Sequence, residues 1–286
     1  MKKIYKLLYI IPIFLMLTAC FSNNINYDYI SEKTFSDSPS GDLTINGSTS
    51  MTKLVNSLGE AFSKLYPDVI VEKSDTGSSA AVNSVINGTS IIGDISRELN
   101  SDETPEKFHE ITIAFDGIAL IVNNNNPINS LSSEQIHDIF SRNLSRWSQL
   151  GGNDLPITLI GREEASGTRE AFENVFNRTN AQYIYTAEYP EAGDILSKVA
   201  SDETAIGYIS ISSISDSIKP LNIDGVKPST ENIVNNTYIL KRPFKEIYLK
   251  NNENPLIKNW FEFIASDEGK NIVKDMKLIP ATIDII

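Results

Sequence analysis

The chain has 286 residues, 41% of them hydrophobic and 22% charged, and its formal net charge is −12 at pH 7. This hydrophobic content is typical of a globular protein and excludes a largely disordered chain. The acidic balance argues against nucleic-acid binding, which usually needs a basic face. With 2 His and 1 Cys, the sequence predicts no intrachain disulfide, no cofactor and no metal site of the His/Cys kind, whereas a site of Asp and Glu alone stays open.

The N-terminal segment has the pattern of an exported lipoprotein. Three lysines precede a short apolar run, residues 7–17, which is too short to span a membrane comfortably. The run leads into a Leu-Thr-Ala-Cys motif, similar to a bacterial lipobox, that ends at Cys20. We therefore predict a signal peptide over 1–19, a lipid on Cys20 facing the periplasm or cell exterior, and a flexible tether over 20–40. A plain signal peptide and an ordered arm are the alternatives.

Between Leu43 and about Ile118, apolar runs alternate with helical stripes, which favours a mostly parallel sheet covered by helices. Residues 111–123 form a nearly continuous β-type run, long enough to cross from one lobe to another. Residues 131–140 follow as a predicted helix, which Ser132 and Gln135 would begin with a capping box.

The second half of the chain continues the alternating pattern. Residues 157–160 predict a buried strand, 205–212 a further apolar strand, and 238–249 a second crossing between lobes. Residues 255–276 predict two helices. The core side chains expected from these helices are Trp260, Phe261 and Ile264.

Three Gly/Ser/Thr turns each follow a short apolar strand and precede a helical stripe, at residues 47–50, 76–79 and 161–168. A helix start presents unpaired N–H groups and a partial positive charge. In the third turn Ser166 occupies the position of an N-cap, and Arg162 lies close enough to reach the same point with its planar guanidinium. If the three turns converge, many donors would face one small anion; otherwise they are ordinary helix caps.

The ordered set of motifs resembles the phosphate-binding proteins of ABC-type phosphate importers, the PstS family, in their compact, lipid-anchored form. The resemblance covers nearly all of the mature chain and implies an α/β fold of the type II periplasmic-binding-protein kind. Two lobes, each a mostly parallel sheet flanked by helices, would close on the anion: lobe I over 41–118 and 238–286, and lobe II over 119–237. The matching motifs are 47–50, 76–79, 92–99, 113–119, Trp147 with 151–152, 162–168 and 205–208.

The resemblance also assigns a role to each site residue. Arg162 would make a charge-assisted fork to two phosphate oxygens, and Gly167 would donate through its backbone N–H. Asp116 would accept the hydrogen bond of the proton that phosphate keeps near neutral pH and sulfate lacks. Ser96 would be an additional contact. The remaining donors would be Thr49, Ser50, Ser78, Ser166 and Thr168.

The sequence departs from one version of the family, in which an Asp follows a Gly-x-Ser motif. This chain has Ser96 and Arg97 there, as the compact members do. We expect Arg97 to form a salt bridge with Glu98 or Asp94 instead of touching the anion. The resemblance implies a monomeric, non-enzymatic receptor that passes inorganic phosphate to a membrane permease, whose ATPase subunit hydrolyses ATP.

Other functions remain as alternatives. A receptor for sulfate or molybdate would share the donors, and a surface adhesin could keep the fold without transport. Residues 50–53 match the Ser-x-x-Lys motif of penicillin-recognising enzymes, but no Lys-Thr-Gly follows. A serine hydrolase lacks its Gly-x-Ser-x-Gly motif, and the two histidines, His109 and His137, are expected on the surface, His137 on the outer face of its helix.

Overall fold

The computed structural model describes residues 39–176, 183–252 and 254–284. The predicted signal peptide, the lipidation site Cys20 and residues 21–38 of the tether lie outside these ranges. No helix within them is long and apolar enough to cross a membrane. The same ranges hold no group of three or more His, Cys, Asp and Glu side chains placed to bind a metal ion.

The N-terminal elements alternate strand and helix, as the sequence predicts. The stripe Leu54, Val55, Leu58 and Phe62 is buried on one face of the first helix because these residues recur every three or four positions. In chain order the elements are β1 (Gly41–Gly47), α1 (Thr52–Leu65), β2 (Val69–Asp75), α2 (Ser78–Ile86), β3 (Ile92–Ile95), the 3₁₀ turns η2 (Ser101–Glu103) and η3 (Pro105–Lys107), and β4 (Phe108–Asn123).

The elements after β4 include the helix that follows the third Gly/Ser/Thr turn, at 161–168, and the two predicted C-terminal helices. The middle of the chain contains β5 (Ser130–Leu131), α3 (Ser133–Phe140), η4 (Trp147–Leu150), β6 (Thr158–Arg162), α4 (Gly167–Phe176), β7 (Ala187–Tyr189), α5 (Ala192–Ser201), β8 (Ala205–Ser210), η5 (Ile211–Ser213), β9 (Ile218–Pro220), β10 (Asn222–Ile223) and α6 (Thr230–Val234). The C-terminal elements are β11 (Lys241–Leu249), α7 (Pro255–Ala265), α8 (Asp267–Asp275) and β12 (Ile279–Pro280).

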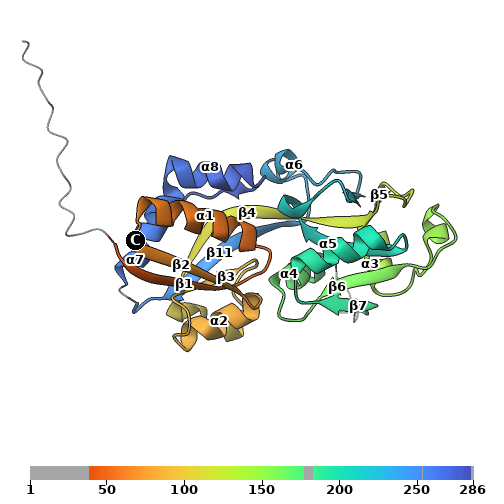
Figure 1. Ribbon diagram of the computed structural model, residues 1–286. Helices are drawn as coiled ribbons and strands as arrows, with labels where there is room; N and C mark the ends of the chain where they lie inside the picture. The colour runs from red at the N-terminus through yellow and green to blue at the C-terminus, as the bar shows by residue number, and fades with distance from the viewer. Residues whose placement is uncertain (1–38, 177–182, 253, 285–286) are drawn as a thin grey trace, which may run out of the picture. The chain divides into compact units, whose positions relative to one another are not determined.

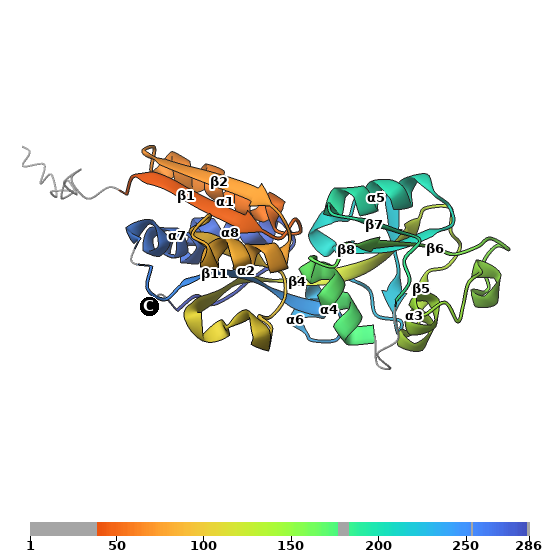
Figure 2. The same cartoon turned by 90° about the horizontal axis from the view of Figure 1, so that it is seen from below.

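The long strand β4 joins two halves of one sheet, whose strand order is β2-β1-β3-β11-β4-β8-β6-β7. Residues 108–117 of β4 pair antiparallel with β11, and residues 118–122 pair antiparallel with β8. The outer strands are parallel, β1 with β2 and β3, and β6 with β7 and β8. We call the strands from β2 to the start of β4 the first half and those from the end of β4 to β7 the second half (Figures 1 and 2). The predicted crossing at 111–123 is thus confirmed.

Each half of the sheet has its own apolar core. In the first half, α1, α7 and α8 cover one face, whereas α2 lies on the other (Figure 1). Trp260, Phe261 and Ile264 are buried in this first core, as predicted. The second core runs from Ile118 at the middle of β4 to Leu240 before β11 and includes the apolar faces of α3, α4 and α5.

Two local predictions can be compared directly with the structure. The capping box of α3 is confirmed, since Ser132 Oγ accepts from Gln135 N at 3.2 Å and Gln135 Oε1 accepts from Ser132 N at 2.8 Å. Among the described residues, the strand predicted over 238–249 as a second crossing pairs only within the first half, with β3 and residues 108–117 of β4. It begins at Lys241 instead of Tyr238. The reason is local, because the backbone N–H groups of Thr237 and Tyr238 both donate to Asn232 O and wind this segment onto the end of α6.

Candidate functional site

The three Gly/Ser/Thr turns come together at the junction of the two halves. Ser50 Oγ lies 2.6 Å from Thr168 Oγ1, which joins the turn before α1 to the start of α4. Ser78 Oγ, at the start of α2, lies 3.4 Å from Ser96 Oγ, which follows β3. Ser48 Oγ donates to the same Ser96 oxygen at 3.0 Å. The site is therefore lined by hydroxyl groups from both halves of the sheet.

Glycines allow the turns to approach this closely. A Cβ on Gly167 would lie 2.4 Å from Ser78 Oγ and 2.8 Å from Ser96 Oγ, so a side chain here would displace both hydroxyls. Gly77 has a φ of +92°, and its Cβ would lie 2.8 Å from the carbonyl oxygen of Ala165. Both positions require glycine because the start of α2 packs directly against the start of α4.

Helix α4 begins as the sequence predicts. Ser166 stands immediately before Gly167, the first helical residue, and its Oγ accepts from Arg169 N at 3.4 Å. Helix α2 begins at Ser78, as expected, but α1 begins at Thr52. The turn at 47–50 is therefore an irregular loop before the helix, in which Met51 N donates to Ser48 O at 3.0 Å.

Arg162 is buried at the end of β6, with 3% of its surface exposed. Its Nη2 donates to Thr49 Oγ1 at 2.7 Å and to Pro190 O at 2.6 Å, and its Nε donates to Tyr189 O at 3.2 Å. Burial, together with the nearby charge of Arg242, lowers the pKa of Arg162 to about 10, although Glu163 and Glu191 oppose this, so the guanidinium remains protonated at neutral pH. Within the described ranges no carboxylate forms an ion pair with it.

Asp116 is fully buried on β4, directly opposite Arg242 on β11. Its Oδ2 accepts from Arg242 Nε at 2.9 Å and Nη2 at 2.7 Å, and its Oδ1 accepts from Ser210 Oγ at 2.8 Å. Burial raises the pKa of Asp116, and the guanidinium of Arg242 opposes that rise. Arg242 also donates through Nη1 to Thr168 Oγ1 at 2.6 Å, which connects Asp116 to the hydroxyl cluster.

Arg242, Ser48 and Ser210 were not predicted as site residues. Arg242 lies in a segment that the sequence showed only as part of a crossing strand. It reaches the site because the antiparallel register of β11 and β4 pairs it with Asp116. This register depends on contacts between distant segments, so no local motif could have identified Arg242.

Arg97 forms salt bridges, as expected, but the predicted partners are wrong. Its Nη2 lies 2.6 Å from Glu103 Oε1, and its Nε lies 2.6 Å from Glu170 Oε2 on α4. The expected partners have other cations, since Glu98 pairs with Lys245 and Asp94 with Lys73. The short η2 turn brings Glu103 back toward Arg97, and the close approach of α4 brings Glu170. Arg97 therefore links the two halves beside the site.

The structure also separates the alternative catalytic groups. Lys53 is exposed whereas Ser50 is buried against Thr168, so the Ser-x-x-Lys residues do not meet as a nucleophile and base. The predicted position of His137 on the outer face of its helix is wrong. Its ring is partly buried, and Nδ1 lies 3.1 Å from Phe176 O, because the end of α4 packs beside α3.

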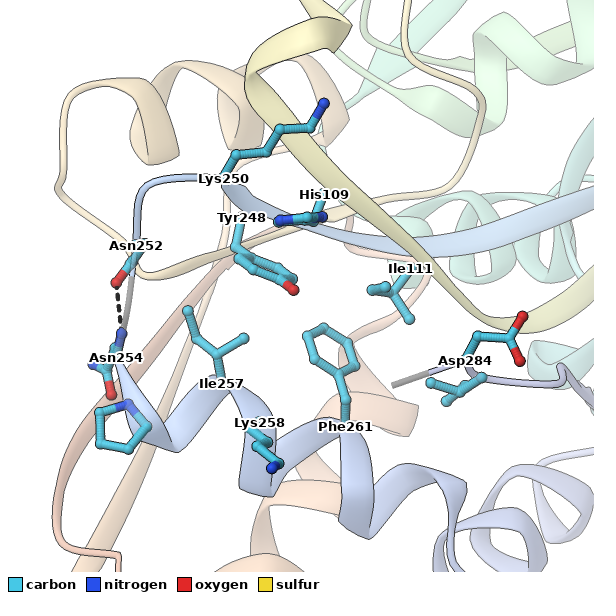
Figure 3. A pocket seen from close by; sticks show the side chains of 12 residues that line it. His109, Ile111, Tyr248, Lys250, Asn252, Asn254, Ile257, Lys258, Phe261 and Asp284 are labelled. Atoms are coloured by element: carbon cyan, nitrogen blue, oxygen red, sulfur yellow. Dashed lines mark hydrogen bonds between the residues drawn. The ribbon is translucent and has the colours of Figure 1, made fainter. Parts of the chain in front are cut away.

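Of two cavities, one lies next to the hydroxyl cluster and the other lies far from it. A small cavity of about 50 Å³ lies beside the cluster. Its lining includes Thr49, Arg162 and Ser166 and also the acidic residues Asp75, Glu163 and Glu191, but not Ser50, Ser78, Ser96, Asp116 or Thr168. A larger pocket, about 280 Å³, contains none of the predicted site residues. The rings of His109, Tyr248 and Phe261 face one another in it (Figure 3). His109 precedes Asp116 by seven positions on β4, roughly 23 Å along an extended strand, so this pocket is remote from the site.

Comparisons with known proteins point to one family. Residues 33–268 match the family described as PBP superfamily domain. The chain is 29% identical to phosphate-binding protein PstS of Bacillus subtilis, over 96% of this chain and 93% of that protein. It is 24% identical to phosphate-binding protein PstS of Borreliella burgdorferi, over 96% of this chain and 97% of that protein.

Two of the solved structures that resemble this chain are also phosphate-transport binding proteins. A putative phosphate ABC transporter substrate-binding protein from Clostridium perfringens, with bound phosphate, superposes with a TM-score of 0.82 and 38% identity, over 85% of this chain and 100% of that chain. An ABC-type phosphate transport receptor from Vibrio cholerae superposes with a TM-score of 0.71 and 31% identity, over 84% of this chain and 100% of that chain. The two-lobe α/β fold expected from the sequence agrees with these neighbours.

Proposed function

Since the chain belongs to the PBP superfamily, and within it to the PstS family, we propose that it is a high-affinity receptor for inorganic phosphate. It binds one phosphate between its two lobes and delivers the anion to a membrane permease of the ABC type. The chemistry of transport belongs to the partner ATPase, and this chain carries out no reaction.

The observation that carries this proposal is the buried, protonated guanidinium of Arg162. A buried charge without an opposite charge costs several kcal/mol unless hydrogen bonds or a bound counter-ion compensate for it. Arg162 bonds only neutral oxygens among the described residues, including Thr49 Oγ1 and Pro190 O. Glu163 and Glu191 act on it only through space, so an oxyanion in the small cavity would supply the directly bonded negative charge and would accept bonds from the neighbouring hydroxyls.

We assign the donors as the family pattern suggests. Arg162 binds two oxygens as a fork, and Gly167 donates its backbone N–H at the start of α4. Side-chain hydroxyls supply the other donors. We assign this role to Thr49, Ser50, Ser78, Ser96, Ser166 and Thr168; among them Ser50 contacts Thr168, Ser78 contacts Ser96, and Thr49 contacts Arg162.

Asp116 provides the discrimination between phosphate and fully deprotonated anions. Phosphate near neutral pH carries at least one proton, which a fixed carboxylate can accept in a hydrogen bond. Sulfate offers only lone pairs and negative charge to the same carboxylate. A mismatch of this kind at a buried polar site weakens binding by several kcal/mol, on the order of 10³-fold or more.

The lobes that close on the anion are assigned to residues 41–118 with 238–286, and to residues 119–237. The two apolar cores support this division to within a few residues, because the second core begins at Ile118 and ends at Leu240, so that Ile118, Tyr238 and Leu240 pack with lobe II. The hydroxyl cluster takes Ser50 from lobe I and Thr168 from lobe II. An anion bonded to both lobes stabilises the closed arrangement and shifts the population toward it.

The cellular setting follows from the N-terminal sequence. The signal peptide directs export, and a lipid on Cys20 holds the receptor on the outer side of the membrane that carries the permease. A tether over 20–40 lets a monomeric receptor reach the permease without leaving the surface.

Calorimetric titration of the full-length protein in detergent tests the proposed function. The protein is first freed of bound anion by partial unfolding and dialysis, and is then titrated with phosphate, arsenate and sulfate. Binding of phosphate and arsenate without heat from sulfate supports the proposal. Comparable binding of sulfate would assign a general oxyanion receptor, and absence of binding to all three would favour the adhesin alternative.

A further inference from the structure

We propose that Arg242 is a positioning and specificity residue of the anion site, which fixes the hydrogen-bonding polarity of both Asp116 and Thr168. Through Arg242, Asp116 can only accept a hydrogen bond from the anion and Thr168 can only donate one. The inference rests on the proposed function and adds to it a residue that does not need to touch the ligand.

The geometry around Asp116 supports its role as an acceptor. Arg242 directs both Nε and Nη2 at Oδ2, and Ser210 donates to Oδ1. The backbone N–H of Gly117 also bonds this carboxylate, and Oδ1 accepts only one of the three side-chain bonds, so Oδ1 is the oxygen that a further donor would have to approach. The P–OH group of a protonated phosphate is such a donor, and the rigid fork of Arg242 fixes the orientation in which Asp116 meets it.

The third contact of Arg242 determines the polarity of Thr168. The guanidinium cannot accept a hydrogen bond, so the 2.6 Å contact between Arg242 Nη1 and Thr168 Oγ1 makes that hydroxyl an acceptor from Arg242. The single hydroxyl proton of Thr168 is then directed elsewhere, toward Ser50 Oγ at 2.6 Å or toward an anion oxygen. One arginine thus bonds both the carboxylate of Asp116 and the hydroxyl of Thr168, and prepares the first as an acceptor and the second as a donor.

Arg242 favours the charged form of Asp116, whose pKa burial raises. The carboxylate of Asp116 is fully buried. The groups facing it are Arg242 from β11, the hydroxyl of Ser210 from β8, Tyr238 from the segment after α6 and the backbone N–H of Gly117. Arg242 is the only cation among the described residues that forms an ion pair with it. Without this charge, burial would favour the protonated carboxyl near neutral pH. A protonated carboxyl is a hydrogen-bond donor and would therefore accommodate sulfate.

The test compares Arg242→Met with the unchanged full-length protein in detergent, using titrations with phosphate and sulfate at pH 5.5, 7 and 8.5. In the unchanged protein we expect strong preference for phosphate at each pH. In Arg242→Met we expect the affinity for phosphate to fall at least tenfold. The ratio of the affinity for phosphate to the affinity for sulfate should also fall at least tenfold. Sulfate binding should weaken again as the pH rises and Asp116 loses its proton.

Two further variants separate specificity from structural damage. Arg242→Lys keeps the charge but not the fork, so it should retain most of the selectivity while binding phosphate less tightly. Arg97→Met removes an arginine that is equally buried, at 3% exposure, and bonds carboxylates outside the hydroxyl cluster. Arg97→Met should weaken the binding of both anions by a similar factor and leave the ratio of the two affinities unchanged.

The proposal is overturned if folded Arg242→Met keeps the selectivity of the unchanged protein at every pH. Should this variant not fold, ¹³C NMR of the Asp116 carboxyl in the unchanged protein gives an independent test. A carboxylate that stays ionised from pH 5.5 to 8.5 supports the proposal, and one that is protonated at pH 7 contradicts it. Failure of the proposed function is a different result, namely that the unchanged protein binds no phosphate.

Discussion

Replacement of Arg162 by Met should abolish most phosphate binding without unfolding the protein. A hydrogen bond to a charged group contributes about 1.5–3 kcal/mol, so a fork of two would contribute roughly 3–6 kcal/mol. Part of this is offset, because Arg162 already bonds Thr49 and Pro190 and must share those donors with the anion. A net loss of about 2–4 kcal/mol corresponds to binding that is roughly 30- to 1,000-fold weaker.

The same substitution should have a different effect on the protein without anion. Met retains the apolar stem of Arg162 and removes a buried charge that has no carboxylate partner among the described residues. The lost hydrogen bonds and the removed desolvation cost oppose each other, so we expect the free energy of unfolding to change by no more than about 1 kcal/mol. Loss of binding and loss of stability are therefore separable.

Thermal unfolding with and without phosphate measures both quantities. A ligand at 100 times its Kd stabilises a protein by about 2.7 kcal/mol, whereas a variant with hundredfold weaker binding gains only about 0.4 kcal/mol at the same concentration. Arg142→Met is the matched control, because Arg142 also bonds neutral oxygens, those of Ile184, Ile157 and Thr186. It should keep the full stabilisation by phosphate. An equal phosphate response in Arg162→Met and the unchanged protein would remove Arg162 from the site.

Three other variants test separate parts of the molecule. Asp116→Asn should reduce the ratio of phosphate affinity to sulfate affinity at least tenfold in calorimetric titration. If the variant rejects sulfate as strongly as the unchanged protein, Asp116 does not discriminate between the two anions. Gly167→Ala should weaken phosphate binding more than tenfold, because its Cβ would lie 2.4 Å from Ser78 Oγ, whereas Gly193→Ala, with no atom within 4 Å, should bind normally. Burial raises the pKa of Asp94 from 3.8 to about 7, despite the nearby Lys73. The folded protein therefore holds the proton on Asp94 more tightly than the unfolded chain does. The stability gained from this proton is fully present below pH 3.8 and is lost as the pH rises through about 7. Asp94→Asn should accordingly raise stability more at pH 8 than at pH 5, by at least about 1 kcal/mol in urea unfolding, and an equal change at both pH values would contradict this.

The sequence by itself determined the features that depend on neighbouring residues. The capping box of Ser132 and Gln135 and the start of α4 after Ser166 follow from spacings of a few residues. The crossing strand was recognisable because residues 111–123 are almost continuously of the β-forming type. The three Gly/Ser/Thr turns were equally visible, and resemblance to a family suggested that they converge.

Only the tertiary structure decided which side chains meet. Arg97 was expected to pair with a carboxylate near it in sequence, but η2 and α4 supply Glu103 and Glu170 instead. Arg242 received no role from the sequence because its partner, Asp116, lies on another strand. A shift of one residue in the register of β11 would place the Arg242 side chain on the opposite face of the sheet. Local sequence therefore specifies the donors, whereas strand pairing and the packing of the two halves select the partners that make them a site.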